Sequence, residues 1–297
     1  MRKSILITGA GGFTGLHACR YFRQAGFEVI AVTRSKHPDS FYVKEYPCDL
    51  TDASAVATLI QAVQPQYLLH LAGQNHVGKS WEEPLTSMEN NAFATLYLLE
   101  ALRKFCPGCK SIIVGSALQF DLNDMTSLKH PYALSKTSQV LFAQAWAQLY
   151  QLPIIIASPS NLIGPGHSTG VCSLLAAQII ASEHCEQITL HVPNSLVRRD
   201  FLDIRDAVRA YAILLEKGVY GESYEVRSGH SKSLEEIINC FQTLVKTNIE
   251  VVTDKQEESF IEILPTKLNQ LLWEPTIPLQ DSLSDILSYH RNQNLKK

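Results

Sequence analysis

The chain has 297 residues, of which 45% are hydrophobic and 19% are charged, and its formal net charge is −3. This composition is typical of a folded globular protein, and the nearly balanced charge gives no reason to expect a nucleic acid as partner. The first apolar run, residues 5–7, is too short for a signal peptide or a membrane span, so we expect a cytoplasmic protein that binds no membrane.

Short apolar runs and stretches of helical periodicity alternate through the first half of the chain. The apolar runs lie at 5–7, 29–32, 68–71, 112–114 and 154–156, and the periodic stretches predict helices over 16–25, 53–63, 87–105 and 132–150. Apolar runs of this kind suit strands buried on both faces. Since alternating strands and helices form parallel sheets with right-handed crossovers, we predict a Rossmann-type, doubly wound α/β fold.

The sequence changes in character after Pro159. Residues 161–166 are rich in turn formers, and beyond them we predict helices over 171–182, 204–216, 234–246 and 279–290 with a strand near 224–226. No low-complexity linker separates the halves. We therefore expect a dinucleotide-binding Rossmann domain over 1–158, to which a stretch of about 201–229 returns. Residues 159–297 would mainly form a smaller, interwoven α/β lobe that binds substrate.

A glycine-rich segment joins the first predicted strand to the first predicted helix. It reads ITGAGGFTG over 7–15. Glycines permit a tight turn and close approach of the backbone to a pyrophosphate, and the helix start offers N–H groups to the anion. A plain glycine turn is the alternative, but the strand–turn–helix context favours a dinucleotide cradle. We expect Gly9, Gly12, Phe13 and Gly15 to bind the cofactor.

The end of the second predicted strand indicates which dinucleotide is bound. An acidic residue there would hold the ribose 2′-hydroxyl of NAD. This chain has Arg34 and Ser35 instead, and a guanidinium with a hydroxyl suits the 2′-phosphate of NADP. We therefore expect NADP(H) to be preferred, with NAD(H) as the other possibility. An exposed loop arginine is the alternative interpretation of Arg34.

Asp49 and Leu50 follow the next segment of the predicted fold. We expect them beside the adenine of the cofactor, where the carboxylate can accept a hydrogen bond from the base. The alternative for Asp49 is a carboxylate at the N-terminus of the following helix, where it would interact favourably with the helix dipole.

The seven cysteines are scattered, and we expect them to be reduced thiols. Cys106 and Cys109 have the spacing of a redox motif. They lie in a turn between a helix and a strand, which is not the setting of such a motif, and no second pair completes a zinc site. We therefore predict no metal site.

Tyr132 and Lys136 open a long predicted helix, directly after Pro131. Their spacing places both side chains on one helical face. A nearby ammonium lowers the pKa of a tyrosine from about 10, so the pair can exchange a proton with a carbonyl or an alcohol. Ser116 follows the strand 112–114 and can hydrogen-bond to the same oxygen. We expect Tyr132 to be the acid/base, Lys136 its electrostatic and ribose-binding partner, and Ser116 the orienting group. A Tyr–Lys pair alone usually has no function; the cradle and Ser116 favour catalysis.

These motifs resemble the extended short-chain dehydrogenase/reductases, also known as the NAD-dependent epimerase/dehydratase family, over nearly the whole chain. Three stretches are similar in particular to GDP-4-dehydro-6-deoxy-D-mannose reductases: HLAGQNHVGKSWEEP (70–84), NLIGPGHSTG (161–170) and RRDFLDIRDAVRAY (198–211). The C-terminal WEPTIPLQDSLSDIL (273–287) fits as well.

The resemblance implies further binding residues. In such enzymes the loop after the fourth strand lies along the nicotinamide ribose, and other positions approach the substrate and its phosphates. The cofactor residues would be Leu71, Ala72, Gly73 and Gln74, and the substrate residues Ser80, Asn91, Asn161 and Arg199. Arg198 could bind phosphate instead, since a guanidinium fork suits phosphate. The alternative for either arginine is a surface ion pair with Asp200 or Asp203.

The resemblance also implies the reaction: NADPH-dependent reduction of the 4-keto group of a nucleotide-linked 6-deoxy sugar, as from GDP-4-dehydro-6-deoxy-mannose to GDP-rhamnose. Leu118 disfavours dehydration, because related 4,6-dehydratases have a carboxylate in this stretch. A nucleotide-sugar C4 epimerase with bound NAD is the alternative, against which Arg34 argues. A non-catalytic dinucleotide sensor is another, against which the intact catalytic residues argue. The helices 87–105 and 132–150 would pair two subunits in a homodimer.

Overall fold

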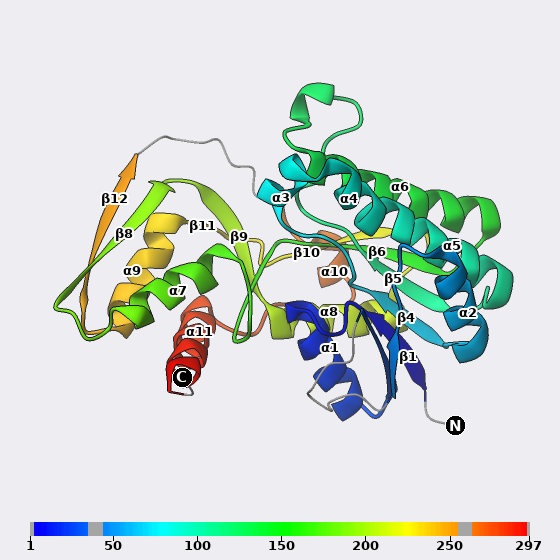
Figure 1. The fold of residues 1–297 in the computed structure, drawn as a ribbon, viewed down its shortest axis with the longest axis horizontal. Coiled ribbons are helices and arrows are strands. Elements are labelled where there is room, and N and C mark those ends of the chain that lie inside the picture. Colours follow the sequence, from blue (N-terminus) through cyan, green and yellow to red (C-terminus); the bar gives the residue numbers. More distant parts are fainter. Residues whose placement is uncertain (1–2, 35–43, 255–262, 296–297) are drawn as a thin grey trace. The chain divides into compact units, whose positions relative to one another are not determined.

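The computed structural model describes residues 3–34, 44–254 and 263–295 (Figure 1). The chain divides into two compact units. The first unit contains residues 1–159 and 208–224, and the second unit contains residues 160–207 and 225–297. Within the described ranges, no helix combines the length and the apolar character needed to cross a membrane.

The first unit is built on a sheet of seven strands in the order β10–β6–β5–β4–β1–β2–β3 (Figure 1). Its strands are β1 (Ser4–Thr8), β2 (Glu28–Thr33), β3 (Lys44–Pro47), β4 (Tyr67–His70), β5 (Lys110–Val114), β6 (Ile154–Pro159) and β10 (Ser223–Val226). β1 pairs in parallel with β2 and β4, and β5 pairs in parallel with β4 and β6. The strand order runs in opposite directions on the two sides of β1, so the predicted doubly wound parallel sheet is confirmed.

β3 is absent from the prediction. It pairs in parallel with β2 at one edge of the sheet, and its sequence KEYP has exposed residues at both ends. An edge strand that is solvated on one side needs no apolar run, so hydrophobic periodicity does not reveal it.

Helices cover both faces of this sheet. The helices are α1 (Phe13–Gln24), α2 (Ala53–Val63), α3 (Val77–Glu82), α4 (Pro84–Met88), α5 (Ala94–Phe105), α6 (Pro131–Tyr150) and α8 (Ile204–Lys217), with a short 3-10 turn, η2 (Met125–Ser127), before α6. Side chains of α2 and α5 pack with Leu6 and Leu68 of the strands, and α6 packs with Ile113 beside them. The strand side chains of opposite parity, such as Ile5 and Ile7, are also fully buried, and α1 contacts β1 and β2.

The helix predicted over 87–105 is interrupted. A π-helical turn, η1 (Glu89–Phe93), separates α4 from α5. Such turns distort a helix locally and are frequent at functional sites. This turn contains Asn91, which is completely buried.

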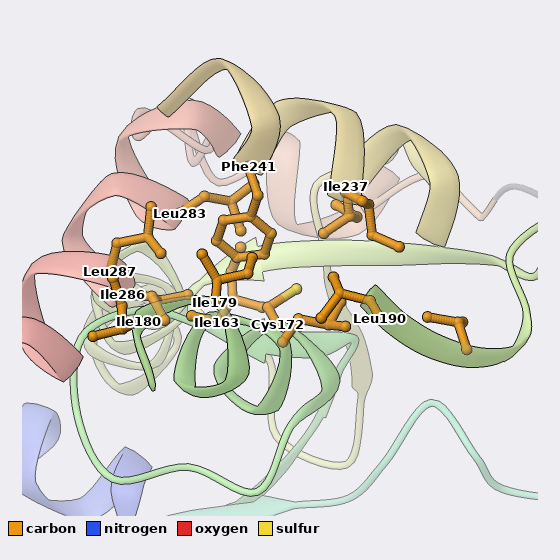
Figure 2. Close-up of a cluster of buried hydrophobic side chains, with 14 of the residues drawn as sticks. Ile163, Cys172, Ile179, Ile180, Leu190, Ile237, Phe241, Leu283, Ile286 and Leu287 are labelled. Atoms are coloured by element: carbon orange, nitrogen blue, oxygen red, sulfur yellow. The ribbon is translucent and has the colours of Figure 1, made fainter. Parts of the chain in front are cut away.

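The second unit has two small sheets and its own core. Its strands are β7 (Asn161–Ile163), β8 (Gln187–Asn194), β9 (Arg198–Asp203), β11 (Ser231–Ser233) and β12 (Asn248–Asp254), and its helices are α7 (Val171–Ala181), α9 (Leu234–Leu244), α10 (Thr266–Asn269) and α11 (Leu279–Asn294). One sheet has the order β11–β9–β7 and the other pairs β12 with β8. Figure 2 shows the core, in which Ile179 of α7, Phe241 of α9 and Leu283 of α11 meet.

These five strands are a second departure from the prediction, which placed only turns and helices there apart from the strand near 224–226. β8 and β12 alternate between more and less buried residues, a period of two that could have revealed them. β7 and β11 have three residues each, too few for any periodicity. β9 begins with the charged residues Arg198, Arg199 and Asp200, which mask its short apolar part.

Candidate active site

The turn between β1 and α1 forms a cradle of backbone groups. Gly9 has a φ of +65°, and a Cβ there would lie 2.8 Å from the Ala72 nitrogen, so only glycine fits this turn. A Cβ on Gly15 would lie 2.1 Å from the Gly9 oxygen. Gly12 is the N-cap of α1, and neither a capping side chain nor an acid stands in the first turn, which begins at Phe13.

This cradle fits the pyrophosphate of a dinucleotide. The first N–H groups of a helix lack intrahelical partners and carry the positive end of its dipole. Here the N-cap has no side chain that could compete with an anion for them. Glycine at the tight positions lets a ligand approach the backbone closely.

Arg34 and Asp49 lie near the carboxyl ends of β2 and β3. Both are exposed, and the charge of Arg34 contributes to a lowered pKa of the Asp49 carboxyl. The largest cause of that lowering is the hydrogen bond from the Thr51 N–H to Asp49 Oδ1 (3.0 Å). Leu50 is buried in the core against α2. Ser35, the predicted partner of Arg34 at a 2′-phosphate, falls outside the described residues.

The first turn of α6 is held by side chains from outside the helix. Pro131 occupies the first turn, where its missing N–H costs no hydrogen bond. The N–H of Tyr132 donates to Ser80 Oγ (3.1 Å), and the N–H of Ala133 donates to His130 Nδ1 (3.0 Å). The helix N-terminus that carries Tyr132 is therefore well satisfied and fixed in place.

Ser116, Tyr132 and Lys136 come together as the sequence predicts. Lys136 Nζ donates to the oxygen of Val114 (2.8 Å), the last residue of β5, and Ser116 follows two residues later. Ser116 hydrogen-bonds with the phenol of Tyr132, and its Oγ also accepts from the N–H of Leu118 (3.1 Å). Tyr132 and Lys136 are both buried, with 7% and 6% of their surface exposed.

The predicted pKa of Tyr132 is wrong in its direction. Burial raises the pKa of the phenol, and the hydrogen bond with Ser116 offsets only part of the rise. Burial also lowers the pKa of Lys136 to about 7, because the ammonium is removed from water. The structure thus keeps the phenol protonated at neutral pH and gives the amine a weakened hold on its proton.

The loop 71–74 is fastened to η1 by Asn91. Asn91 Oδ1 accepts from the Gln74 N–H (2.7 Å), and Asn91 Nδ2 donates to the Gln74 oxygen (3.0 Å). A Cβ on Gly73 would lie 2.6 Å from Asn91 Oδ1. Gly73 is therefore required for this contact, in addition to any contact with a cofactor.

Ser80 and Asn91 are expected to touch substrate, yet both are fully buried. Ser80 Oγ donates to the Val77 oxygen (2.6 Å) and accepts from the Tyr132 N–H. The amide of Asn91 is occupied by Gln74 and by Ser135 Oγ (2.8 Å). This geometry favours a positioning role over direct contact with substrate.

Asn161 and Arg199 lie on the neighbouring strands β7 and β9 of the second unit. Asn161 Nδ2 donates to the Asp200 oxygen (3.0 Å), and Arg199 Nη1 donates to the Arg198 oxygen (2.7 Å). Arg198 pairs with Glu236 (3.0 Å) and with Ser231, rather than with Asp200 or Asp203 as the alternative interpretation has it.

The cysteines are free thiols. The Cys109 N–H donates to the Cys106 oxygen (3.0 Å) and closes the turn between α5 and β5. In the part of the chain that the structure describes, no group of three or more histidine, cysteine, aspartate or glutamate side chains is arranged to bind a metal ion.

Sequence reasoning missed four buried polar residues of this region: Thr8, His70, Thr95 and Ser135. His70 Nδ1 lies 2.7 Å from Thr8 Oγ1, and His70 Nε2 lies 2.8 Å from Thr95 Oγ1. A signal was present, since Thr8 and His70 are polar residues at the ends of otherwise apolar strands. Buried polar groups need partners, so such positions predict a network even where the partners are unknown.

The model of the NAD dependent epimerase/dehydratase family matches residues 5–226. GDP-6-deoxy-D-mannose reductase of Pseudomonas aeruginosa is 27% identical to this chain, over 97% of each protein.

Solved structures agree in fold. The structure of RMD from Pseudomonas aeruginosa complexed with NADPH superposes with a TM-score of 0.83 at 26% identity, covering 98% of this chain and 99% of that one. UDP-glucose 4-epimerase of Thermotoga maritima with UDP-glucose gives a TM-score of 0.85 at 22% identity, over 98% of this chain and 99% of that chain. At that identity, the second likeness bears on the fold alone.

Proposed function

The chain belongs to the NAD-dependent epimerase/dehydratase family, and we propose that it reduces the 4-keto group of a nucleotide-linked 6-deoxy sugar, with GDP-4-dehydro-6-deoxy-mannose as substrate and GDP-rhamnose as product. The observation that carries the proposal is the buried Tyr132, which retains its proton and hydrogen-bonds with Ser116. A phenol in this state is prepared to donate to a carbonyl oxygen. The name of the 27% identical relative points to the same chemistry.

The side chains divide the work of carbonyl reduction. Tyr132 gives its proton to the carbonyl oxygen as negative charge develops there, and Ser116 orients that oxygen by a hydrogen bond. Lys136, one helical turn away, holds the cofactor ribose and stabilises the phenolate left behind. Because Lys136 is buried, its charge interacts more strongly with the phenolate than it would in water. When bound, NADPH supplies the hydride.

NADP(H) is the cofactor we propose, held by the cradle and by the loop 71–74. Arg34 is exposed where the 2′-phosphate would lie, and no acid replaces it at the end of β2. Asp49 is near enough to Arg34 for the guanidinium charge to help lower its pKa, and we propose that it contacts the adenine. The relative solved with NADPH supports this choice over NAD.

In the second unit, Asn161 and Arg199 are the residues we propose for the phosphates of the sugar nucleotide. They lie on adjacent strands of one sheet, which makes a joint contact with one ligand possible. A guanidinium is the side chain best suited to phosphate.

We also propose a homodimer. α6 exposes Leu134 and Leu141, which are seven residues apart and so lie on one helical face, and the neighbouring η1 exposes Phe93. Exposed apolar side chains gathered on one face are typical of protein interfaces. Light scattering should give the mass of two chains, and a Leu134→Lys, Leu141→Lys double variant should give the mass of one.

The reaction is tested by mixing the purified protein with NADPH and GDP-4-dehydro-6-deoxy-mannose and following the loss of nicotinamide absorbance. Product analysis should identify a GDP-linked 6-deoxyhexose. NADPH-only and sugar-only mixtures are the controls, and NADH in place of NADPH tests the role of Arg34. Bound NADPH without oxidation by this sugar would refute the proposed substrate, and conversion of a nucleotide sugar to its C4 epimer would replace the proposal with epimerisation.

A further inference from the structure

His70 ends β4 and lies between two threonine hydroxyls. Its Nδ1 faces Thr8 Oγ1 and its Nε2 faces Thr95 Oγ1, at 2.7 and 2.8 Å. Burial lowers the pKa of His70 to about 3, and the charge of Lys136 acts in the same direction, so the imidazole is neutral at neutral pH. A neutral imidazole donates from one nitrogen and accepts at the other.

The neighbouring hydroxyls decide which nitrogen carries the hydrogen. Thr95 Oγ1 donates its single hydrogen to the Asn91 main-chain oxygen (2.7 Å), so toward His70 Nε2 it can only accept. Thr8 Oγ1 accepts from the N–H groups of residues 71 and 72, each at 3.2 Å, which fills its two lone pairs. Its hydrogen is therefore free to bond to His70 Nδ1. Protonation at Nε2 pairs every group, whereas protonation at Nδ1 would point three donors at one hydroxyl oxygen.

Asn91 continues these bonds to the catalytic helix. Its main-chain oxygen receives Thr95, and its side-chain amide bonds to both backbone groups of Gln74 and to Ser135 Oγ. Ser135 Oγ in turn donates to the oxygen of Tyr132 (2.9 Å). An unbroken series of buried hydrogen bonds thus runs from the end of β1, past the loop 71–74, to the first turn of α6.

We infer that Thr8, His70, Thr95, Asn91 and Ser135 form one positioning chain, with His70 held as the Nε2–H tautomer. This chain of hydrogen bonds fixes the loop 71–74 and the first turn of α6 relative to each other. The inference rests on the proposed function for what is aligned: the dinucleotide at the loop and the proton donor on the helix. All five residues are buried, so they act through the groups that they hold. A displacement of about 1 Å at a reacting group can lower a rate by about a hundredfold, which gives such a chain its importance.

Thr95 is the residue at which to test the chain. It is completely buried, and within the described part of the protein its hydroxyl bonds to His70 and to the Asn91 main-chain oxygen, both of which belong to the positioning chain. Thr95→Val keeps the shape but leaves the His70 Nε2–H without its acceptor, whereas Thr95→Ser keeps the hydroxyl. Thr58→Val is the matched control, because Thr58 Oγ1 also donates to the oxygen four residues earlier (Ser54, 2.9 Å), on the exposed face of α2.

Two measurements on the full-length variants separate positioning from mere stability. We expect Thr95→Val to weaken dinucleotide binding in calorimetry and to lower kcat by about tenfold to a hundredfold in protein that remains folded at the assay temperature, with KM for the sugar little changed. Thr95→Ser should recover most of both, and Thr58→Val should change neither. Unaltered binding and kcat in folded Thr95→Val, or a loss that Thr95→Ser does not rescue, would overturn the inference.

The tautomer is tested without any substrate. Long-range proton–nitrogen NMR spectra of the wild-type protein should show His70 protonated only at Nε2 and unchanged as the pH is lowered from 8 to 5. Protonation at Nδ1, or titration within this range, would overturn the assignment. If the sugar is not turned over, this spectrum and the dinucleotide binding of the Thr95 variants still decide the inference, so its failure is distinguishable from failure of the proposed reaction.

Discussion

The two ends of the seven-stranded sheet are finished in different ways. At the carboxyl end, β1 leads into Gly9, β4 ends in His70 and β5 leads into Ser116. Gly9 has no room for a Cβ, and His70 hydrogen-bonds to Thr8, a residue far away in the sequence. At this end, polar side chains and accessible backbone groups lie together where the neighbouring strands β1, β4 and β5 end.

At the amino end of the same strands, polar groups of the described residues pair with one another between neighbouring strands. The Ser4 N–H donates to Gln66 Oε1, and the Gln66 N–H donates to Ser4 Oγ, both at 3.2 Å. The Lys110 N–H donates to the Gln66 oxygen (3.0 Å). The difference follows from topology, because in parallel α/β sheets the helices begin at the carboxyl end and offer their unpaired N–H groups there.

The largest effect that this contrast predicts is for Tyr132→Phe at the carboxyl end. The variant loses the proton donor but keeps the ring, so kcat should fall by about 10²- to 10⁴-fold. The midpoint of thermal unfolding and the dinucleotide affinity should stay close to wild type, since the ring is kept and the hydrogen bond that is lost joins the phenol to Ser116, another catalytic residue. A variant with wild-type kcat would place the proton donor elsewhere.

Much of this end of the sheet could be predicted from the sequence. The cradle and the Tyr132–Lys136 pair each lie within one short segment, so their spacing, together with the predicted strands and helices around them, indicates both. The bond between Thr8 and His70 joins residues 62 positions apart, and that between Asn91 and Ser135 joins residues 44 apart. No local pattern encodes such pairings. Likewise, the sign of the Tyr132 pKa shift depends on how deeply the folded chain buries the phenol, which spacing cannot tell.

The next effect in size concerns the glycines at the two ends. Gly15→Ala would place a Cβ 2.1 Å from the Gly9 oxygen, and overpacking of this severity destabilises the folded cradle by about 3 kcal/mol. We expect dinucleotide binding to weaken by about a hundredfold, measured by calorimetry. Gly108→Ala at the amino end is the matched control, because a Cβ there meets no atom within 4 Å. Equal losses in the two variants would break the comparison.

Lys136 predicts a pH dependence of stability at the carboxyl end. Its folded pKa of about 7 lies below the ordinary value for lysine, so above pH 7 the unfolded chain binds more protons than the folded one. Stability from this group therefore rises with pH above 7. Relative to Lys136→Met, the wild-type free energy of unfolding should increase by about 2 kcal/mol between pH 7 and 8.5. Denaturant unfolding at several pH values measures this, and a constant difference would contradict it.

The smallest effect on function is expected at the amino end, in the turn that contains Cys106 and Cys109. The hydrogen bond from the Cys109 thiol lowers the pKa of Cys106 to about 7, while that same bond and burial raise the pKa of Cys109. Cys106 is also partly exposed, so iodoacetamide should modify it in preference to Cys109, at a rate that increases most steeply near pH 7. Peptide mass spectrometry of Cys185→Ser protein, which lacks the exposed thiol, measures the rate, and Cys106→Ser is the control.

Because this turn lies at the opposite end of β5 from Ser116, we expect the modified protein to keep its kcat and its dinucleotide affinity. A loss of either on modification of Cys106 alone would show that the two ends of the sheet are coupled and that chemistry is not confined to the carboxyl end.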